Sequence, residues 1–110
     1  MSITVNLYYK GKDGSARKFV EEMEASGTAD AIRREEGNEK YDYFLSLKDP
    51  ETVLLIDSWR DQEALDLHHA SPMMATLAAL RDKYDLTMQV ERYKSDESGI
   101  PEGDERFIRR

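Results

Sequence analysis

The order of strand and helix signals constrains this chain more than any other feature of its sequence. Alternating or clustered apolar, β-branched and aromatic residues predict four β-strands, over residues 3–9, 39–47, 52–59 and 86–93. Apolar residues at helical spacing predict helices between the first and second strands and between the third and fourth. The order strand, helix, strand, strand, helix, strand is typical of a ferredoxin-like α+β fold, with an antiparallel sheet and both helices on one face.

Both helical regions carry start and stop signals in their interior. Gly27 divides the first region, and Ser71 followed by Pro72 divides the second. Ser15 and Asp61 are expected to be the N-caps that open the two regions. Each region is therefore predicted to contain two helical segments.

The strand TVLLIDSW, residues 52–59, is the most apolar and is expected to lie centrally in the sheet. The turn sequence KDPE separates it from the preceding strand, which predicts a hairpin. In the last strand, the residues expected to face the core are Leu86, Met88 and Val90.

One face of this sheet would remain uncovered in a single chain. That face would carry Tyr41, Tyr43, Val53 and Leu55, or else the residues that alternate with them. Either set forms a large apolar patch, which usually marks an interface. We therefore expect a homodimer in which two sheets pack face to face.

Composition excludes several classes of function. The net charge is −7, with 23 acidic and 16 basic residues, and the basic residues form no stripe. Nucleic acid and anionic membranes are therefore not expected as partners. The absence of cysteine excludes disulfides and thiolate chemistry. Because neither a signal peptide nor a long apolar span is evident, we expect a cytoplasmic protein.

The chain is expected to form one domain over residues 1–94, followed by a polar tail over residues 95–110. The tail is rich in acidic residues and contains Gly and Pro, but it also carries Phe107 and Ile108. It could be a disordered end. Alternatively, it could be an arm that docks these two side chains on a partner subunit.

Residues 37–74, GNEKYDYFLSLKDPETVLLIDSWRDQEALDLHHASPMM, resemble the antibiotic biosynthesis monooxygenase family. The shared features are the Gly before the second strand, the Y-x-x-F in it, the D-P of the hairpin, the strand ending in Trp, and H-x-A-S-P. The resemblance implies a dimeric α+β barrel of the quinol monooxygenase type. It says less about function, because relatives include cofactor-independent oxygenases of quinols and anthrones, haem-degrading enzymes and isomerases.

The two histidines are adjacent on the second helical region, so their side chains point about 100° apart. His68 matches the histidine of H-x-A-S-P and is taken as the inward one, whereas His69 is expected to face solvent. His68 could orient or deprotonate a phenolic hydroxyl, or it could be a hydrogen-bonded core residue. No metal site is expected, because adjacent histidines cannot share one ion at helical geometry.

The other candidate residues are aromatic, apolar or amide side chains. Trp59, Tyr41 and Met73 are expected to wall a pocket for an aromatic substrate, although each could equally be core. Asn6 lies alone in an apolar strand. It could be satisfied within the fold, or it could donate to a substrate oxygen, as the resemblance to haem-degrading relatives implies. Ala78 stands where the axial histidine of those relatives would fall, which disfavours haem degradation.

We therefore expect a monooxygenase without a cofactor, which oxidises a small aromatic polyol or quinol with dioxygen. His68 and Asn6 would be its catalytic residues. The alternative is a dimeric barrel that binds a metabolite without chemistry, and haem binding is a weaker third reading.

Overall fold

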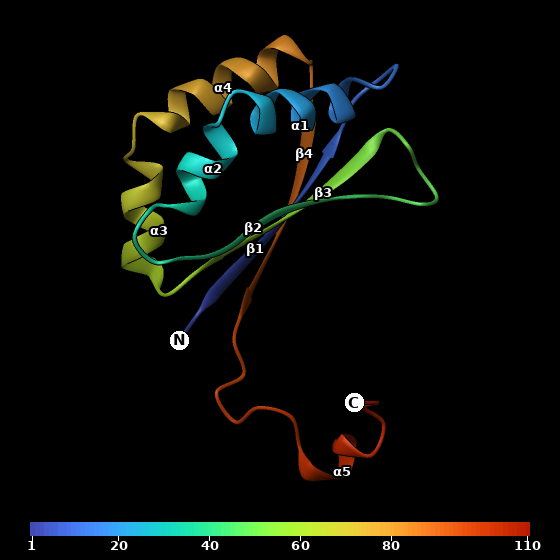
Figure 1. The fold of residues 1–110 in the computed structure, drawn as a ribbon, viewed down its shortest axis with the longest axis vertical. Coiled ribbons are helices and arrows are strands. Elements are labelled where there is room, and N and C mark those ends of the chain that lie inside the picture. Colours follow the sequence, from blue (N-terminus) through green and yellow to red (C-terminus); the bar gives the residue numbers. More distant parts are fainter.

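The computed structural model describes residues 1–110 and has the expected element order. The elements are β1 (Ile3–Lys10), α1 (Ser15–Ala25), α2 (Thr28–Arg33), β2 (Asn38–Leu45), β3 (Thr52–Trp59), α3 (Gln62–His69), α4 (Met73–Lys83), β4 (Thr87–Lys94) and α5 (Glu102–Glu105). The strands form one antiparallel sheet in the order β2-β3-β1-β4. Helices α1 to α4 cover one face of that sheet (Figure 1). This confirms the predicted ferredoxin-like fold, the central place of β3 and the β2–β3 hairpin.

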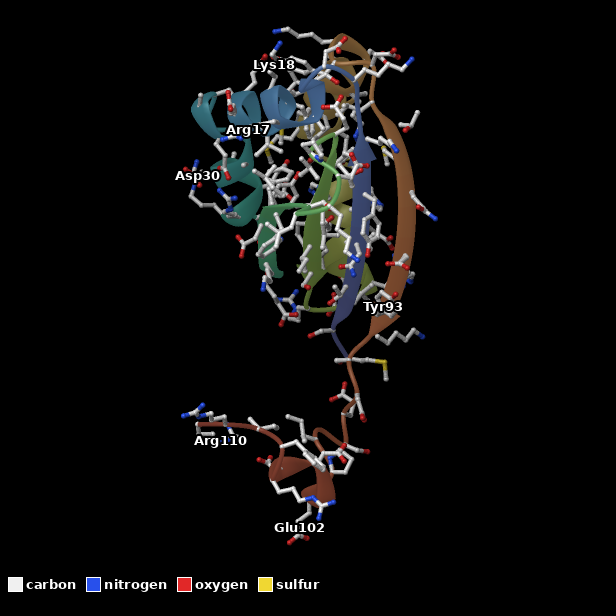
Figure 2. The ribbon with its side chains drawn as sticks, turned by 90° about the vertical axis from the view of Figure 1, so that its right-hand side faces the viewer. Arg17, Lys18, Asp30, Tyr93, Glu102 and Arg110 are labelled. Atoms are coloured by element: carbon white, nitrogen blue, oxygen red, sulfur yellow. The ribbon has the colours of Figure 1, made fainter.

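The two faces of the sheet follow from the two-residue period of a strand. In β3, all four helix-facing residues are buried: Val53, Leu55, Asp57 and Trp59. The residues between them, such as Leu54 and Ile56, are only half-buried, because they lie on the uncovered face. Seen from the side, α1 and α2 lie on one side of the sheet (Figure 2). The bare face therefore consists of the alternates of the core residues.

Several predicted element ends differ by one or two residues, for local reasons. Asp61 caps α3 as expected, since its side chain accepts from the Ala64 backbone N–H at 2.9 Å. Ser15, however, is the first residue of α1, and its hydroxyl accepts from the Lys12 N–H. Strand β2 ends at Leu45 because the Ser46 hydroxyl accepts two N–H groups of the following turn.

Strand β4 is an edge strand that the helices leave largely uncovered. Met88 and Val90 lie on its helix-facing side, opposite Tyr9 and Leu7. They nevertheless remain 42% and 54% exposed. The prediction was therefore right about the side of the sheet that Met88 and Val90 face, but wrong in expecting them to be buried. The space between β4 and the helices is open.

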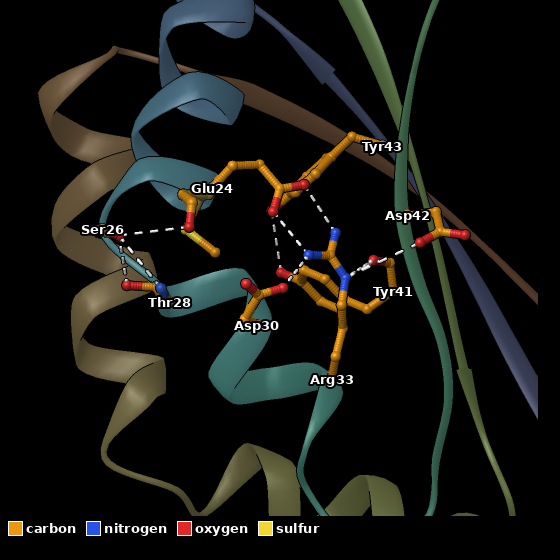
Figure 3. A network of polar contacts seen from close by, with 9 residues as sticks. Glu24, Ser26, Thr28, Asp30, Arg33, Tyr41, Asp42 and Tyr43 are labelled. Carbon is orange, nitrogen blue, oxygen red and sulfur yellow. Dashed lines mark hydrogen bonds and ion pairs between the residues drawn. The ribbon is translucent and has the colours of Figure 1, made fainter.

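Arg33 joins α1, α2 and β2 through one network (Figure 3). Its two terminal nitrogens bind the Glu24 carboxylate at 2.7 and 2.8 Å, and one of them also binds Asp30. Its Nε donates to the Tyr41 carbonyl at 2.8 Å. The carboxylates hold the pKa of Arg33 above its ordinary value. The network fixes the chain just before the turn that leads into β2.

After β4 the chain leaves the sheet. The Ser95 N–H donates to the Ser2 carbonyl at 2.9 Å, which ties the two ends of the domain together. Residues 96–110 then extend away from the body and include α5 (Figure 1). Phe107 is 74% exposed there. None of the helices is long and apolar enough to span a membrane.

Gly37, between α2 and β2, is required by close packing as well as by its backbone. Its φ is +84°, in the left-handed region that favours glycine, and an added Cβ would overlap the Cβ of Ala64 in α3. Its carbonyl also accepts from the Arg60 N–H at 2.8 Å. Gly37 therefore sets how closely the α2–β2 turn approaches α3.

We expect Gly37→Ala to lower the free energy of unfolding by about 2–4 kcal/mol, because backbone strain and overpacking add. Gly27→Ala is the matched control. Gly27 has φ +81° but no atom near its missing Cβ, so that variant meets only the backbone strain, about 1 kcal/mol. Urea denaturation at one protein concentration compares the two variants. Equal losses would show that contact with Ala64 is unimportant.

Candidate functional site

A cavity of about 320 Å³ lies between the helix-facing side of the sheet and helices α3 and α4. This volume is near the lower end of the range for small-molecule sites, about 300–1,000 Å³. Its apolar lining includes Leu7, Leu55, Leu65, Met74, Leu77 and Val90. Its polar lining consists of Tyr41, Asp57, His68, His69, Arg81 and Arg92. The cavity is therefore mainly apolar, with a few ionisable groups.

His68 is held in place on both sides of its ring. Its side chain is only 3% exposed, and Nδ1 lies 2.7 Å from a carboxylate oxygen of Glu35. The ring stacks on the Trp59 indole, with centroids 4.6 Å apart. Burial lowers the pKa of His68, while the Glu35 carboxylate opposes that shift. With the Nδ1 proton donated to Glu35, the neutral ring has Nε2 as a free acceptor.

Asp57, on β3, is a buried carboxyl that lines the same cavity. Its Oδ1 accepts from the Trp59 indole N–H at 2.7 Å. Burial raises the pKa of Asp57 to about 7, although the bond from Trp59 opposes the shift. Such a carboxyl exchanges a proton near neutral pH, as a general base does.

Asp57 was not among the site residues predicted from the sequence. The sequence does contain a signal for Asp57: it alternates with Leu55 and Trp59 along the apolar strand, so it faces the core as they do.

Two arginines reach the cavity from opposite walls. Arg81, on α4, donates to the Tyr9 hydroxyl at 2.9 Å, and its Nε is buried without a partner. Arg92, on β4, contacts the Gln62 side chain at the start of α3. Sequence reasoning assigned neither residue to the site. Only the fold brings the C-terminal half of α4 and the edge strand to one cavity.

Tyr41 closes the deep end of the cavity. Its hydroxyl lies 3.2 Å from that of Tyr43, on the same strand. Burial raises the pKa of both phenols well above the ordinary value. Both therefore remain neutral hydrogen-bonding groups at physiological pH.

The structure brings some of the predicted site residues together but not all. His68 and Tyr41 line the cavity. Trp59 is fully buried behind His68 and contacts its ring. Met73 packs against the core, whereas its neighbour Met74 lines the cavity. His69 is exposed, as expected, but lies at the edge of the same cavity.

Asn6 does not reach this cavity. Its neighbours Val5 and Leu7 line the cavity, so the two-residue period of β1 places Asn6 on the opposite face of the sheet. There its Oδ1 is buried and has no hydrogen-bond partner. The expectation that Asn6 and His68 act on one ligand within a subunit is therefore wrong. A single amide residue in an apolar strand stands out in the sequence, but only the pairing of the strands shows which side of the sheet it faces.

The raised pKa of Asp57 has a consequence for stability. In the unfolded chain the carboxyl ionises near its ordinary value, whereas in the folded chain it ionises near 7. The native state therefore loses stability as pH rises from about 4 to 7, with no further loss from this group above that.

We expect Asp57→Asn to remove that loss, because an amide oxygen can still accept from Trp59 but carries no charge. The free energy of unfolding of the variant, relative to that of the wild type, should increase by at least about 1 kcal/mol between pH 4 and pH 8. Thermal denaturation across this pH range measures the difference. If the difference in stability between Asp57→Asn and the wild type did not change with pH, the raised pKa of Asp57 would be contradicted.

Comparison with known proteins agrees with the fold. The family model described as antibiotic biosynthesis monooxygenase matches residues 2–80. The Bacillus subtilis (strain 168) protein named "Putative monooxygenase YcnE" is 30% identical over 67 residues, which are 61% of this chain and 68% of YcnE.

Solved structures share the whole fold at low identity. SnoaB of Streptomyces nogalater, described as a cofactor-independent oxygenase, has a TM-score of 0.71 at 14% identity, with 87% of this chain and 94% of SnoaB covered. A conserved protein of Methanosarcina mazei Go1 has a TM-score of 0.73 at 22% identity, with 87% and 94% covered. From the family match over residues 2–80 and the similarity to YcnE, the chain belongs to the antibiotic biosynthesis monooxygenase family.

Proposed function

We propose that the protein oxidises a small aromatic polyol or quinol with dioxygen, without a cofactor, in the cavity between the sheet and α3 and α4. The observation that carries this proposal is the pairing of a mainly apolar cavity with His68, whose Nδ1 is engaged by Glu35. Apolar walls suit an aromatic ring and exclude water, and a fixed imidazole can take a phenolic proton.

The chemistry requires no further reagent. Removal of a proton from a hydroquinone or anthrone gives an electron-rich anion, which can pass an electron to dioxygen. The two radicals combine with a new C–O bond, and loss of water then leaves the oxidised product. For an anthrone, the balance is one anthrone and one O₂ giving one anthraquinone and one H₂O. One oxygen atom enters the product and the other leaves as water.

Four of the polar lining residues have a role in this proposal: Tyr41, Asp57, His68 and Arg81. His68 accepts the phenolic proton at Nε2, and Glu35 positions the ring by holding Nδ1 at 2.7 Å. Asp57, on the sheet side of the cavity, is the alternative base. The guanidinium of Arg81 stabilises the anion that forms, because a positive charge in an apolar site acts strongly on it. Tyr41 and Met74 contact the ring, and Trp59 supports His68 from behind.

The comparisons support the reaction class. SnoaB, which shares the fold, is described as a cofactor-independent oxygenase, and YcnE is named for monooxygenase activity. The substrate and the lack of a cofactor are proposals for this chain.

We expect His68→Gln to lower quinol-dependent oxygen uptake by about 10²-fold or more, because glutamine cannot take the proton. Oxygen uptake with a naphthohydroquinone, corrected for autoxidation in the same buffer, measures the effect. Glu63→Gln is the control, since Glu63 is exposed on the same helix and does not line the cavity. A His68→Gln variant that retains full activity would contradict the assignment of the base.

The pH profile separates the two candidate bases. Burial lowers the pKa of His68 from its ordinary value, with smaller contributions from His69 and Arg81 in the same direction, while Glu35 opposes the shift. With His68 as the base, activity should rise with pH on the acid side of the ordinary imidazole range and then level. With Asp57 as the base, the midpoint should lie near 7 and should vanish in Asp57→Asn. Tight binding of a quinol with no oxygen uptake at any pH would instead indicate a binding protein.

We also propose that two subunits pair through the bare face of the sheet. That face carries Tyr8, Phe44, Leu54, Ile56 and Tyr93, of which Phe44 and Tyr93 are the most exposed. A second copy would remove these apolar side chains from water. In such a dimer, residues 95–110 would be an arm that docks Phe107 and Ile108 on the partner.

We expect Ile56→Asp to convert the dimer to a monomer, because Ile56 lies at the centre of the bare face, between Asn6 and Asp42. A charge there would be left unpaired in the interface. Leu67→Asp is the control, since Leu67 is exposed on α3. Light scattering after size exclusion gives the masses. A dimer that survives Ile56→Asp would exclude this face.

A further inference from the structure

The cavity concentrates positive charge in an otherwise acidic chain. The chain has a net charge of −7, yet Arg81 and Arg92 both line the cavity, and its only acidic lining residue is Asp57. Asp57 is buried and already bonded to Trp59. The positive charges therefore have no equal negative charge within the cavity.

Neither arginine is paired with a carboxylate. Elsewhere in the folded body, Arg17, Arg33 and Arg60 each form an ion pair within 4.0 Å. Arg34 forms none, but it is exposed and does not line the cavity. Arg81 has only the neutral Tyr9 hydroxyl as a hydrogen-bond partner, and Arg92 has only the neutral Gln62 side chain. In a chain with more acidic than basic groups, two unpaired arginines at one cavity indicate a missing anion.

Arg81 is the stronger indication of the two. Its Nε is buried without an acceptor, and its guanidinium lies 5.5 Å from the centre of the Tyr9 ring. A buried guanidinium nitrogen without a partner is costly, and an anion that binds there would remove that cost. Arg92 faces the same cavity from β4, on the side that the helices leave open.

We propose that the ligand of this cavity is an aromatic carboxylate, with its ring against the apolar lining and its carboxylate on Arg81. The planar guanidinium matches a carboxylate in a bidentate contact. Arg92 adds a second positive charge near the opening. This proposal rests on the proposed function, since it names the substrate class of the same cavity, and it assigns Arg81 to the substrate carboxylate in place of the phenolate. The substrate would then be a phenol or quinol that also carries a carboxylate.

Calorimetric titration with 2-naphthoate and 2-naphthamide tests the proposal. The two probes match in size, differ in charge and have no phenolic hydroxyl, so binding is measured without oxygenation. We expect the carboxylate to bind at least about tenfold more tightly than the amide, because charge-assisted hydrogen bonds to a half-buried guanidinium are stronger than neutral ones. Arg81→Gln should abolish this preference, and Arg92→Gln should reduce it by a smaller factor.

Arg17→Gln is the charge-matched control, because Arg17 is exposed on α1 and pairs with Glu21. It should leave the preference unchanged. Equal affinity for the two probes, no binding of the carboxylate, or a preference that persists in a folded Arg81→Gln variant would overturn the proposal. Circular dichroism checks the fold of each variant. If Arg81→Gln does not fold, the decision falls to Arg92→Gln, where an unchanged preference overturns the proposal.

The outcome is separable from that of the proposed function. A preference for the carboxylate in a protein that takes up no oxygen either with neutral quinols or with 1,4-dihydroxy-2-naphthoate, a quinol that carries a carboxylate, supports the anion site and contradicts the oxygenase. Oxygen uptake with neutral quinols, together with equal binding of the two naphthalene probes, supports the oxygenase and overturns the anion site.

Discussion

The stack of Trp59 on His68 is the contact on which the rest of the site depends. It joins the end of the central strand β3 to the last turn of α3. Each ring also uses one nitrogen for a carboxylate: the indole binds Asp57 and the imidazole binds Glu35. Two aromatic rings and two acids therefore form one buried polar unit between sheet and helix. Such units are costly unless every member is bonded, so the geometry of each member constrains the others.

Most of the fold could be predicted from local patterns. The order of strands and helices along the chain follows from apolar periodicity, and the division of both helical regions follows from Gly27 and Pro72. These signals are local, so they need no knowledge of packing. Element ends were less predictable, because the hydroxyls of Ser15 and Ser46 could either cap an element or close a turn. The burial of Met88 and Val90 depended on which strands the helices cover, which no local pattern contains.

The candidate site was predictable only in part. The inward direction of His68 followed from its adjacency to His69 and from the family pattern. Asn6 was wrongly assigned to the cavity, because alternate residues of a strand face opposite sides of the sheet. Val5 and Leu7 lie on the cavity side of β1, so Asn6 lies on the other side. Glu35 and Arg81 come from elements far apart in sequence, and neither stands in a motif. Long-range proximity of this kind arises only when the helices dock.

Because Gly37 packs against Ala64, the geometry of the cavity depends on two residues that have no reactive group. Gly37 follows Glu35 by two residues, and Ala64 precedes His68 by one helical turn. The small size of both residues lets the α2–β2 turn lie against α3, and that approach brings the carboxylate to the imidazole. The position of the His68 imidazole against Glu35 is thus tied to the absence of side-chain atoms on a neighbouring turn. During divergence within the family, a single added methyl group at residue 37 could alter the proton affinity of the histidine while every polar residue stayed the same.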